Sequence, residues 1–400
     1  MLDLDPIALA KWQIARDRDR TQRFADTFAR KVARMRPSPL AFLRGAAPLF
    51  YELLAARPEL ARCPDEEGWL IGDLHIENFG AFVAEAAGRQ PAGPTFDLND
   101  FDDAIIGPLR LDVLRLSTSL LLAARELGAN GGQALEMVRE LIDSWDAHLM
   151  KATAMPPLPR PVHALIEQVR TRSRTDLLDA RTRVVRGRRR FVRGPRYAAL
   201  PTAVEKGLEA AFGGYVESLP EELRPEPEQL EIVDAAYRIA GTGSLGVLRV
   251  AVLVAGKGGP DGGWIFDLKE QGPPSGAAFG RVPDGPGATR VEAALRACLS
   301  RPPRLVGTTR LAGMSMLGRR LSPQDDKLDL GRIAGADLPP LARYLGALLG
   351  NAHRRGAAAA GAAPPKRSWS AADRASIVDN AIRLAGIHEA VYLAYCAQTA

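Results

Sequence analysis

The sequence predicts an α+β protein with two lobes, and three observations lead to this prediction. The chain has 400 residues, which is more than one hydrophobic core usually holds and suits two lobes or domains. Apolar residues recur at helical spacing near both ends of the chain. The clearest strand pattern is confined to residues 230–270, where two strand-like runs flank a glycine-rich turn.

The N-terminal part is predicted to be helical and then to change to short strands. Helical spacing of apolar residues covers residues 8–35, and a second helical pattern covers residues 39–56. Between residues 69 and 103, short apolar pieces alternate with glycines and carboxylates, which indicates short strands and loops. Residues 112–126 and 132–151 return to helical periodicity, and their leucine-rich faces indicate core helices.

The second half of the chain alternates helices with one β region. Residues 201–224 read as a helix, and the prolines that follow indicate a lobe boundary near Pro227. Strand-like runs at residues 247–255 and 264–269 flank a turn of glycines, Pro and Asp. Further helices are predicted over residues 291–299, over residues 339–355 with Gly356 ending that helix, and from Ser370 onward.

Charge alone does not identify a partner. The formal net charge of +6 could attract a polyanion, but net charge argues about attraction rather than about fold. Arginine greatly outnumbers lysine throughout the chain, which is typical of a bias in base composition. Residues 170–196 carry eleven arginines and few aromatics, so we interpret them as a solvated basic surface and regard a nucleic-acid partner as unlikely.

The sequence also bears on the compartment. The longest apolar stretches are far shorter than the ~18 residues needed to cross hydrocarbon, so no membrane partner is expected. The first residues lack the basic start and apolar centre of a secretory signal, and we expect a cytoplasmic protein. Three scattered cysteines indicate neither a disulfide framework nor a zinc site.

The most informative segment is Gly72–Gly80. It contains Asp73 and Asn78 at the spacing Asp-x-x-x-x-Asn, which phosphoryl transfer uses for a carboxylate that orients the attacking hydroxyl and an amide that holds a metal. The acidic run Phe96–Asp103 follows, and hard cations such as Mg²⁺ prefer carboxylate oxygens. His75 could orient substrate or phosphate. The alternative is that these residues cap turns and form a solvated loop.

A second candidate segment is Gly241-Thr242-Gly243-Ser244-Leu245-Gly246, a match to G-x-G-x-x-G. A strand-like run follows it, which argues against a Rossmann turn and favours the glycine-rich hairpin that covers nucleotide phosphates in kinases. Lys269, near the end of the following strand, would then hold the α- and β-phosphates, and Glu292 on the next helix would pair with it. The alternative is an ordinary surface hairpin.

Together these residues resemble the protein-kinase-like superfamily, especially its aminoglycoside-phosphotransferase-like branch. The blocks at residues 38–45, 72–80, 96–103 and 241–246 are more closely similar to an uncharacterised bacterial domain family, domain of unknown function 2252, whose members carry these blocks in this order. The similarity extends over nearly the whole chain. It implies a protein-kinase-like two-lobed fold that binds ATP and Mg²⁺.

The resemblance implies roles for individual residues. Asp73 would be the catalytic-loop aspartate and Asn78 a metal ligand. Asp100 would be the metal-binding aspartate at the DFG-like position, with Asp97 and Asp102 as competitors for it. We therefore take Asn78, Asp100 and Asp102 as the candidate metal ligands.

Two departures from the kinase pattern affect the expected fold. The glycine loop and Lys269 follow the catalytic loop here, whereas in kinases they precede it, so the fold would be circularly permuted. The helix that ends near His353 would then stand before the catalytic loop. Ile71 occupies the position where kinases usually carry His, which leaves the support of that loop open. Asp112 would be a structural aspartate.

A permuted kinase-like fold implies four parts. We expect N-terminal helices in residues 1–60 and a C-lobe-like part with the catalytic and metal-binding loops in residues 61–229. A β-rich, N-lobe-like nucleotide-binding part would follow in residues 230–335. Residues 336–400 would complete the C-lobe with helices.

The function expected from these residues is an ATP- and Mg²⁺-dependent phosphotransferase that acts on a small molecule or a protein hydroxyl. Lys269 and the glycine loop would hold ATP, and Asp73 would steer the acceptor. Transfer of AMP in place of phosphate and a catalytically silent nucleotide-binding module are the alternatives. The acceptor is left open.

Overall fold

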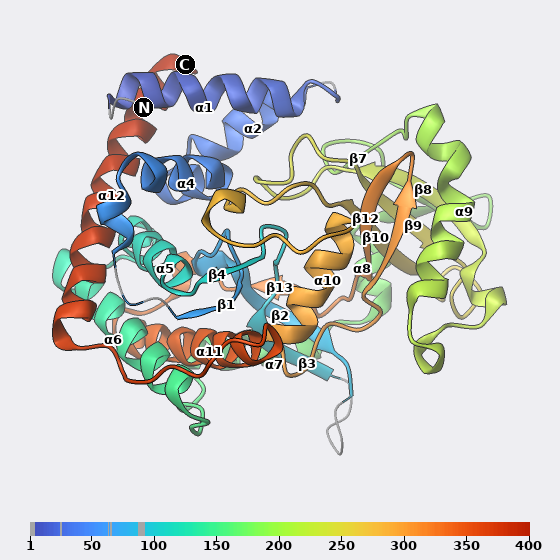
Figure 1. The fold of residues 1–400 in the computed structure, drawn as a ribbon. Helices are drawn as coiled ribbons and strands as arrows, with labels where there is room; N and C mark the ends of the chain where they lie inside the picture. Colours follow the sequence, from blue (N-terminus) through green and yellow to red (C-terminus); the bar gives the residue numbers. More distant parts are fainter. Residues whose placement is uncertain (1–4, 25, 63, 65, 87–92) are drawn as a thin grey trace.

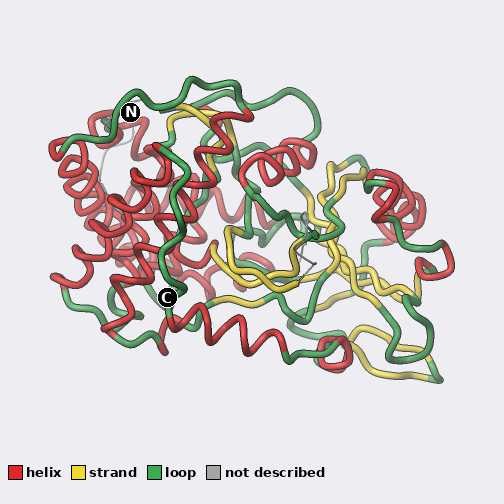
Figure 2. Tube along the Cα trace, turned by 90° about the horizontal axis from the view of Figure 1, so that it is seen from below, coloured by secondary structure: helices red, strands yellow, loops and turns green. Residues whose placement is uncertain are grey.

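Helices fill one side of the molecule, and the largest sheet lies on the other side (Figures 1 and 2). The computed structural model describes residues 5–24, 26–62, 64, 66–86 and 93–400. Within these ranges the chain mixes helices with short antiparallel strands, which confirms an α+β protein in the general sense. None of the helices in these ranges combines the length and apolar character needed to traverse a lipid bilayer.

Four long helices build the helical side. They are α5 (Arg110–Ala123), α6 (Gly131–Met150), α11 (Leu338–Ala359) and α12 (Ala371–Gln398). Helices α6 and α11 pack closely along each other because small residues face the contact. A Cβ added at Gly346 would lie 2.3 Å from the carbonyl oxygen of Leu141.

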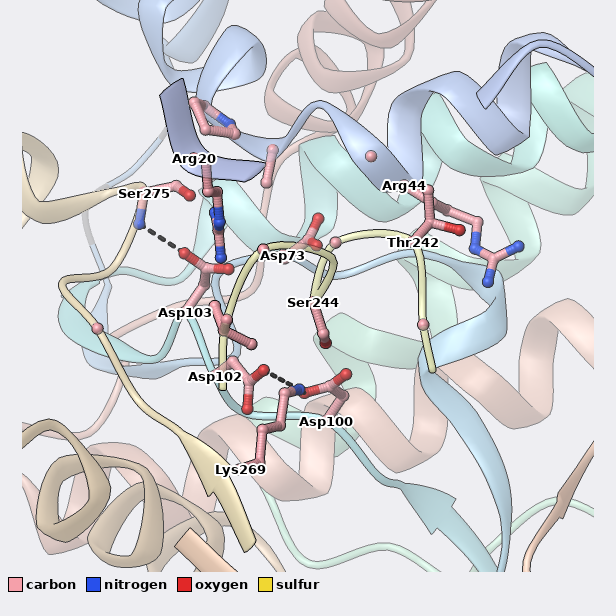
Figure 3. Close-up of a pocket in the computed structure, with 18 of the residues that line it drawn as sticks. Arg20, Arg44, Asp73, Asp100, Asp102, Asp103, Thr242, Ser244, Lys269 and Ser275 are labelled. Carbon is pink, nitrogen blue, oxygen red and sulfur yellow. Dashed lines mark hydrogen bonds and ion pairs between the residues drawn. The ribbon is translucent and has the colours of Figure 1, made fainter. Parts of the chain in front are cut away.

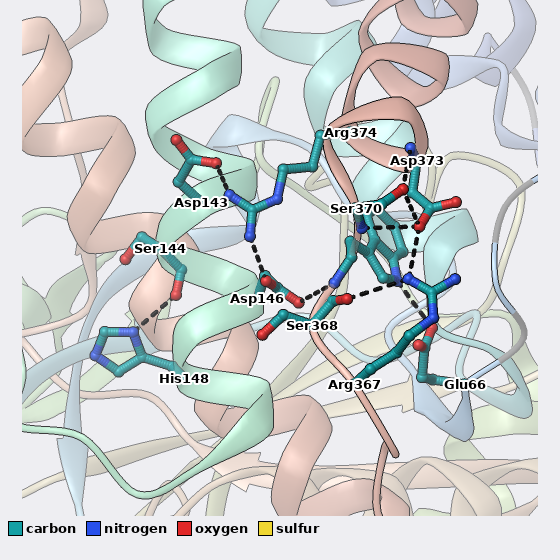
Figure 4. A network of polar contacts seen from close by, with 11 residues as sticks. Glu66, Asp143, Ser144, Asp146, His148, Arg367, Ser368, Ser370, Asp373 and Arg374 are labelled. Atoms are coloured by element: carbon teal, nitrogen blue, oxygen red, sulfur yellow. Dashed lines mark hydrogen bonds and ion pairs between the residues drawn. The ribbon is translucent and has the colours of Figure 1, made fainter.

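The last helix is attached to α6 by a polar network at its start (Figure 4). Ser370 caps α12 by accepting a hydrogen bond from the backbone N–H of Asp373. The Arg374 guanidinium lies between two carboxylates of α6, those of Asp143 and Asp146, and the Asp146 contact measures 2.5 Å. The start of α12 at Ser370 is thus as predicted, and ion pairs hold it in place.

The N-terminal helices are more broken than the sequence pattern predicts. Residues 8–35 form two helices, α1 (Pro6–Thr21) and α2 (Thr27–Met35), because Asp26 adopts left-handed backbone with φ of 59° between them. Residues 39–56 likewise form α3 (Pro39–Gly45) and α4 (Ala47–Ala56). Pro48 lies in the first turn of α4, where a missing N–H costs nothing.

Helix α11 continues past the glycine that was predicted to end it. It extends to Ala359, so Gly356 lies inside the helix. A Cβ at Gly356 would lie 3.0 Å from both the Cys298 sulfur and the Trp69 Cβ. The glycine therefore serves close packing, and the prediction of a helix end there was wrong.

A six-stranded antiparallel sheet forms the other side, in the order β11-β12-β10-β9-β8-β7. Its outer strands and the helix on one face are β7 (Tyr197–Ala198), β8 (Ile232–Arg238), β11 (Gly307–Leu311), β12 (Met314–Arg320) and α9 (Thr202–Ser218). The predicted strand pair is present as β9 (Arg249–Val254) and β10 (Trp264–Glu270). Residues of α9 share a hydrophobic cluster with this sheet. The sheet-bearing unit therefore begins before residue 230, the boundary that the sequence suggested.

Smaller elements complete the chain and join the two sides. Strand β1 (Glu67–Leu70) pairs with β4 (Ile105–Pro108), and a three-stranded sheet has the order β13-β2-β3. Its strands are β2 (Phe79–Ala84), β3 (Gly93–Leu98) and β13 (Asp326–Lys327). The remaining elements are α7 (Arg160–Arg170), α8 (Arg174–Asp179), the hairpin of β5 (Thr182–Val185) and β6 (Arg188–Phe191), and α10 (Gly287–Cys298). The early acidic segments thus form strands and loops, as predicted.

The first and last helices lie side by side (Figure 1). Gln398 Nε2 donates a hydrogen bond of 3.3 Å to the carbonyl oxygen of Ile7. Arg36 Nη1 donates one of 3.1 Å to the carbonyl oxygen of Thr399. The two ends of the described chain are therefore neighbours in space.

Candidate active site

One cavity of about 540 Å³ brings together segments from distant parts of the sequence. The early acidic loops, the glycine loop before β9, the end of β10 and the end of α1 all line it. Among the predicted site residues, those lining the cavity are Asp73, His75, Asn78, Asp100, Asp102, Gly241, Gly243, Ser244, Gly246 and Lys269. Figure 3 shows the glycine loop passing beside Asp73, and it shows Lys269, Asp100 and Asp102 below the loop.

Asp73 is held by a buried arginine. Arg115 of α5 is fully buried, and its guanidinium contacts Asp73 Oδ1 with both Nε, at 3.0 Å, and Nη2. The same guanidinium lies 4.9 Å from the centre of the Phe50 ring. Burial raises the pKa of Asp73 to about 7, although Arg115 opposes the shift. The carboxyl is therefore poised to gain or lose a proton near neutral pH.

The loop that carries Asp73 is held by hydrogen bonds to a buried aspartate, Asp112. Asp112 accepts hydrogen bonds from the backbone N–H groups of Ile71, at 2.7 Å, and Gly72, at 3.0 Å. Its Oδ2 also lies 3.0 Å from Nε2 of His353. Nδ1 of His353 accepts from the Trp145 indole at 3.0 Å, so Nε2 carries the proton and donates to Asp112. A histidine from α11 thus supports the loop where Ile71 cannot.

Asn78 and His75 form the rest of the loop. Asn78 Nδ2 donates to the Asp73 backbone carbonyl oxygen at 2.7 Å, which fixes the orientation of the amide. The amide oxygen is a group that can coordinate a metal ion. His75 is buried, and its Nδ1 has no hydrogen-bond partner in the described parts of the chain. Burial, with Arg44 nearby, lowers the pKa of His75 well below its usual value. Its imidazole is therefore neutral at pH 7.

Lys269 points from β10 to two carboxylates. Its Nζ forms an ion pair with Asp102, which Figure 3 draws as a dashed line. The same Nζ lies 3.8 Å from Oδ1 of Asp100. Gln271 Nε2 donates to Asp102 Oδ1 at 2.8 Å. Burial and the Asp100 charge raise the pKa of Asp102, whereas Lys269 and Lys327 lower that of Asp100 against the effect of burial.

Two predicted roles require correction. Glu292 lies on α10, as the next helix, but its carboxylate pairs with Arg296 at 3.0 Å and not with Lys269. It does not line the cavity, and Arg296 lies one helical turn away, at the i,i+4 spacing that favours such an ion pair. Asp97 is also absent from the lining, since it lies within β3 and accepts from its neighbour Leu98 N–H at 2.8 Å. Of the three competing aspartates, Asp100 and Asp102 face the cavity.

The glycine loop packs closely against the end of α1, and one of its contacts requires glycine. Gly246 has φ of +95°, and a Cβ there would lie 2.3 Å from the Arg20 carbonyl oxygen. At Gly243 a Cβ would lie 3.9 Å from Asp73 Oδ2. The loop therefore lies between the end of α1 and the Asp73 carboxylate. Ser244 extends from it toward Asp100 (Figure 3).

Several lining residues were not predicted from the sequence. Arg16, Arg20 and Arg23 reach the cavity from the end of α1 and beyond, and Arg23 pairs with Glu270 at 2.8 Å. Lys327 of β13 lines the opposite region. No spacing rule marks them, because they lie far in the sequence from both motifs. Arg44 also lines the cavity, and its guanidinium pairs with Glu77 at 2.6 Å.

The residues beside Lys269 fit a magnesium ion in part. Asn78, Asp100 and Asp102 offer two carboxylates and an amide oxygen along one wall, and these are ligand types that Mg²⁺ prefers. Within the parts of the chain that the structure describes, no three His, Cys, Asp or Glu side chains are grouped to hold an ion. The described side chains alone therefore form an incomplete set of magnesium ligands.

The raised pKa of Asp73 has a measurable consequence for stability. Its carboxyl has a pKa of about 7 when folded, against about 3.9 when unfolded. Between these values the folded state holds a proton that the unfolded state has lost, so unfolding free energy falls as pH rises from about 4 to about 7. We expect this decline in metal-free wild-type protein, relative to Asp73→Asn, in urea unfolding at several pH values. Parallel curves for the two proteins would contradict the shift.

Comparison with known proteins identifies a family. Residues 23–398 match the model of the family described as "Uncharacterized protein conserved in bacteria (DUF2252)". The chain belongs to this family, because the match covers most of its length. No curated protein and no solved structure matches it.

Proposed function

We propose that this member of the DUF2252 family is an ATP- and Mg²⁺-dependent phosphotransferase with a circularly permuted kinase-like fold. One observation carries the proposal. Asp73 and Lys269, 196 positions apart in the sequence, line the same cavity together with Asn78, Asp100 and the glycine loop. Phosphoryl transfer depends mainly on positioning and charge stabilisation, and these are the groups it employs.

Each side chain has a task within this proposal. Lys269, held between Asp100 and Asp102, offers its ammonium to the nucleotide phosphates. Asp73 accepts the proton of the acceptor hydroxyl, a role suited to a carboxyl with pKa of about 7. Arg115 fixes the direction of that carboxylate. A magnesium ion, bound at Asn78 and Asp100, would supply positive charge to the phosphate oxygens.

The contact between the first and last helices supports the permuted topology. A circular permutation opens the parent chain at a point where it was continuous, so the elements on either side of the opening stay close together. Here α1 and the end of α12 are in contact. The His353 of α11 reaches the loop of Asp73 through Asp112, as expected for a helix that would precede this loop in the unpermuted order.

The cavity extends toward α1 rather than along the sheet beyond Lys269. On that stretch of sheet, the buried Asp267 carboxylate binds Arg249, at 2.5 Å, and Arg238, at 2.6 Å, and none of these residues lines the cavity. A nucleotide whose phosphates lie at Lys269 would therefore direct its base toward the N-terminal helices.

Transfer of AMP is a second candidate, favoured by the arginines of α1. Arg16, Arg20 and Arg23 line the cavity in addition to Lys269, and arginine suits phosphate recognition. A nucleotide in the reverse direction would place its terminal phosphates there. Mass spectrometry of the reaction products identifies phosphate or adenylate on the acceptor and so separates the two candidates.

Substitution of Lys269 tests the nucleotide site. We expect Lys269→Ala to weaken Mg-ATP binding by roughly tenfold or more, because a charge-assisted hydrogen bond to phosphate is lost. Calorimetric titration of the full chain measures this change. Lys257→Ala serves as the matched control, since Lys257 is exposed in the turn after β9. Unaltered Mg-ATP affinity in Lys269→Ala would exclude Lys269 from the nucleotide site.

A further inference from the structure

A second cavity, of about 270 Å³, lies where the six-stranded sheet meets β2. Phe82 and Val83 of β2, Trp264 at the start of β10, the end of β12 and residues 321–325 line it. It shares no lining residue with the larger cavity. The segment 321–325 leads into β13, whose Lys327 lines the larger cavity.

Arginine dominates this second cavity. Five arginines from three segments of the chain line it, and the one acidic side chain among its lining residues is Asp325. The arginines are Arg172, Arg174, Arg304, Arg319 and Arg320. Such a set leaves a surplus of positive charge around a small enclosed volume.

Internal ion pairs offset only part of that charge. Arg172 pairs with Asp326 at 2.5 Å, and Arg319 lies 4.0 Å from Asp325. Arg174 donates to the carbonyl oxygen of Gly262 at 3.0 Å. Among the residues that the structure describes, no carboxylate lies within ion-pair distance of Arg304 or Arg320.

Arg320 is the most constrained of the five. Its guanidinium carbon lies 4.8 Å from the centre of the Trp264 ring, so stacking holds its position. Burial lowers the pKa of Arg320 to about 10, and the nearby Arg304 and Arg174 act in the same direction. A partly buried cation surrounded by like charges is unfavourable unless an anion is bound beside it.

We propose that this second cavity binds a small molecule that bears a phosphate group. The planar guanidinium fork matches phosphate oxygens, and arginines from several segments can contact one dianion. The volume accommodates a phosphate with a small organic attachment. The ligand would contact β2 as well as the ends of β10 and β12, and so would join the two sides of the molecule. This proposal does not depend on the proposed phosphotransferase activity.

The test uses the full chain with inorganic phosphate and pyrophosphate as probes. Thermal unfolding and calorimetric titration are measured against chloride at equal ionic strength. We expect saturable binding by the wild type and by Lys269→Ala. Arg304→Gln and Arg320→Gln should each bind roughly tenfold more weakly, because each removes charge-assisted hydrogen bonds. Arg183→Gln, an exposed arginine of the β5–β6 hairpin, is the matched control and should bind as the wild type does.

Three results would overturn the proposal. They are the absence of a saturable effect beyond chloride, equal binding by wild type and Arg304→Gln, and loss of binding in Lys269→Ala alone. The last result would assign the phosphate to the larger cavity. If Arg320→Gln does not fold, Arg304→Gln decides the question, because Arg304 is exposed.

Discussion

Asp73→Asn is expected to lower the rate of nucleotide turnover by roughly 10²–10⁴-fold, the range that a positioned acid or base contributes. The glycine loop approaches the Asp73 carboxyl, whose Oδ2 would lie 3.9 Å from a Cβ at Gly243. Asparagine keeps the shape of the side chain but cannot accept the hydroxyl proton. The measurement is turnover of Mg-ATP at saturating nucleotide, with product identification and a parallel binding titration.

The controls separate chemistry from folding. Asparagine leaves Arg115 without its anion, so thermal unfolding must show that the variant is folded before its rate is interpreted. Asp19→Asn removes one negative charge from the same cavity and should keep most of the activity. A rate for Asp73→Asn within about threefold of wild type would exclude Asp73 as the base. Wild-type protein that binds Mg-ATP but turns none over would be a silent nucleotide-binding module.

Asp112→Ala is expected to cost about 3–5 kcal/mol of the free energy of unfolding, a typical loss when one partner of a buried charged network is removed. The side chains of Asp112 and His353 are fully buried. Alanine would leave the N–H groups of Ile71 and Gly72 without an acceptor, and each buried unsatisfied group adds to the cost. The measurement is urea unfolding of wild type and variant at pH 7.

The matched control for this effect is Asp284→Ala. Asp284 is exposed, so its removal should change the free energy of unfolding by less than about 0.5 kcal/mol. Destabilisation of Asp112→Ala by less than about 1 kcal/mol, with turnover of Mg-ATP unchanged from wild type, would show that the buried network does not hold the loop. A stable but inactive Asp112→Ala would instead assign Asp112 to positioning of Asp73 alone.

Much of the secondary structure could be predicted because it is local. The strands on either side of Gly256–Gly263 were predictable, because strand-like runs flank a segment rich in turn residues. The N-cap at Ser370 is likewise readable from adjacent residues. The motif that holds Asp73 and Asn78 was recognisable for the same reason, since both residues lie within one short segment.

The wrong predictions concern places where distant packing outweighs local pattern. Gly356 has the sequence signature of a helix end, but Cys298 and Trp69 require a small residue inside the helix. The prediction paired Glu292 with Lys269 because the order of motifs resembles that in kinases. In the structure Glu292 pairs with Arg296, which lies one helical turn away on the same helix. The break at Asp26 is different, because it is local: Thr27 Oγ1 donates to the Thr21 carbonyl oxygen at 2.8 Å across the turn, and helical periodicity alone did not reveal it.

The sequence by itself determined which residue types with phosphate-handling chemistry the chain carries and on which local elements they lie, because motifs and periodicity are short-range properties. Only the tertiary structure decided that Asp73 and Lys269 face one cavity, that Arg115 and His353 support it, and that a second cavity gathers five arginines. These facts depend on contacts between residues that are tens to hundreds of positions apart. Such contacts follow from how whole helices and sheets pack, which no local pattern encodes.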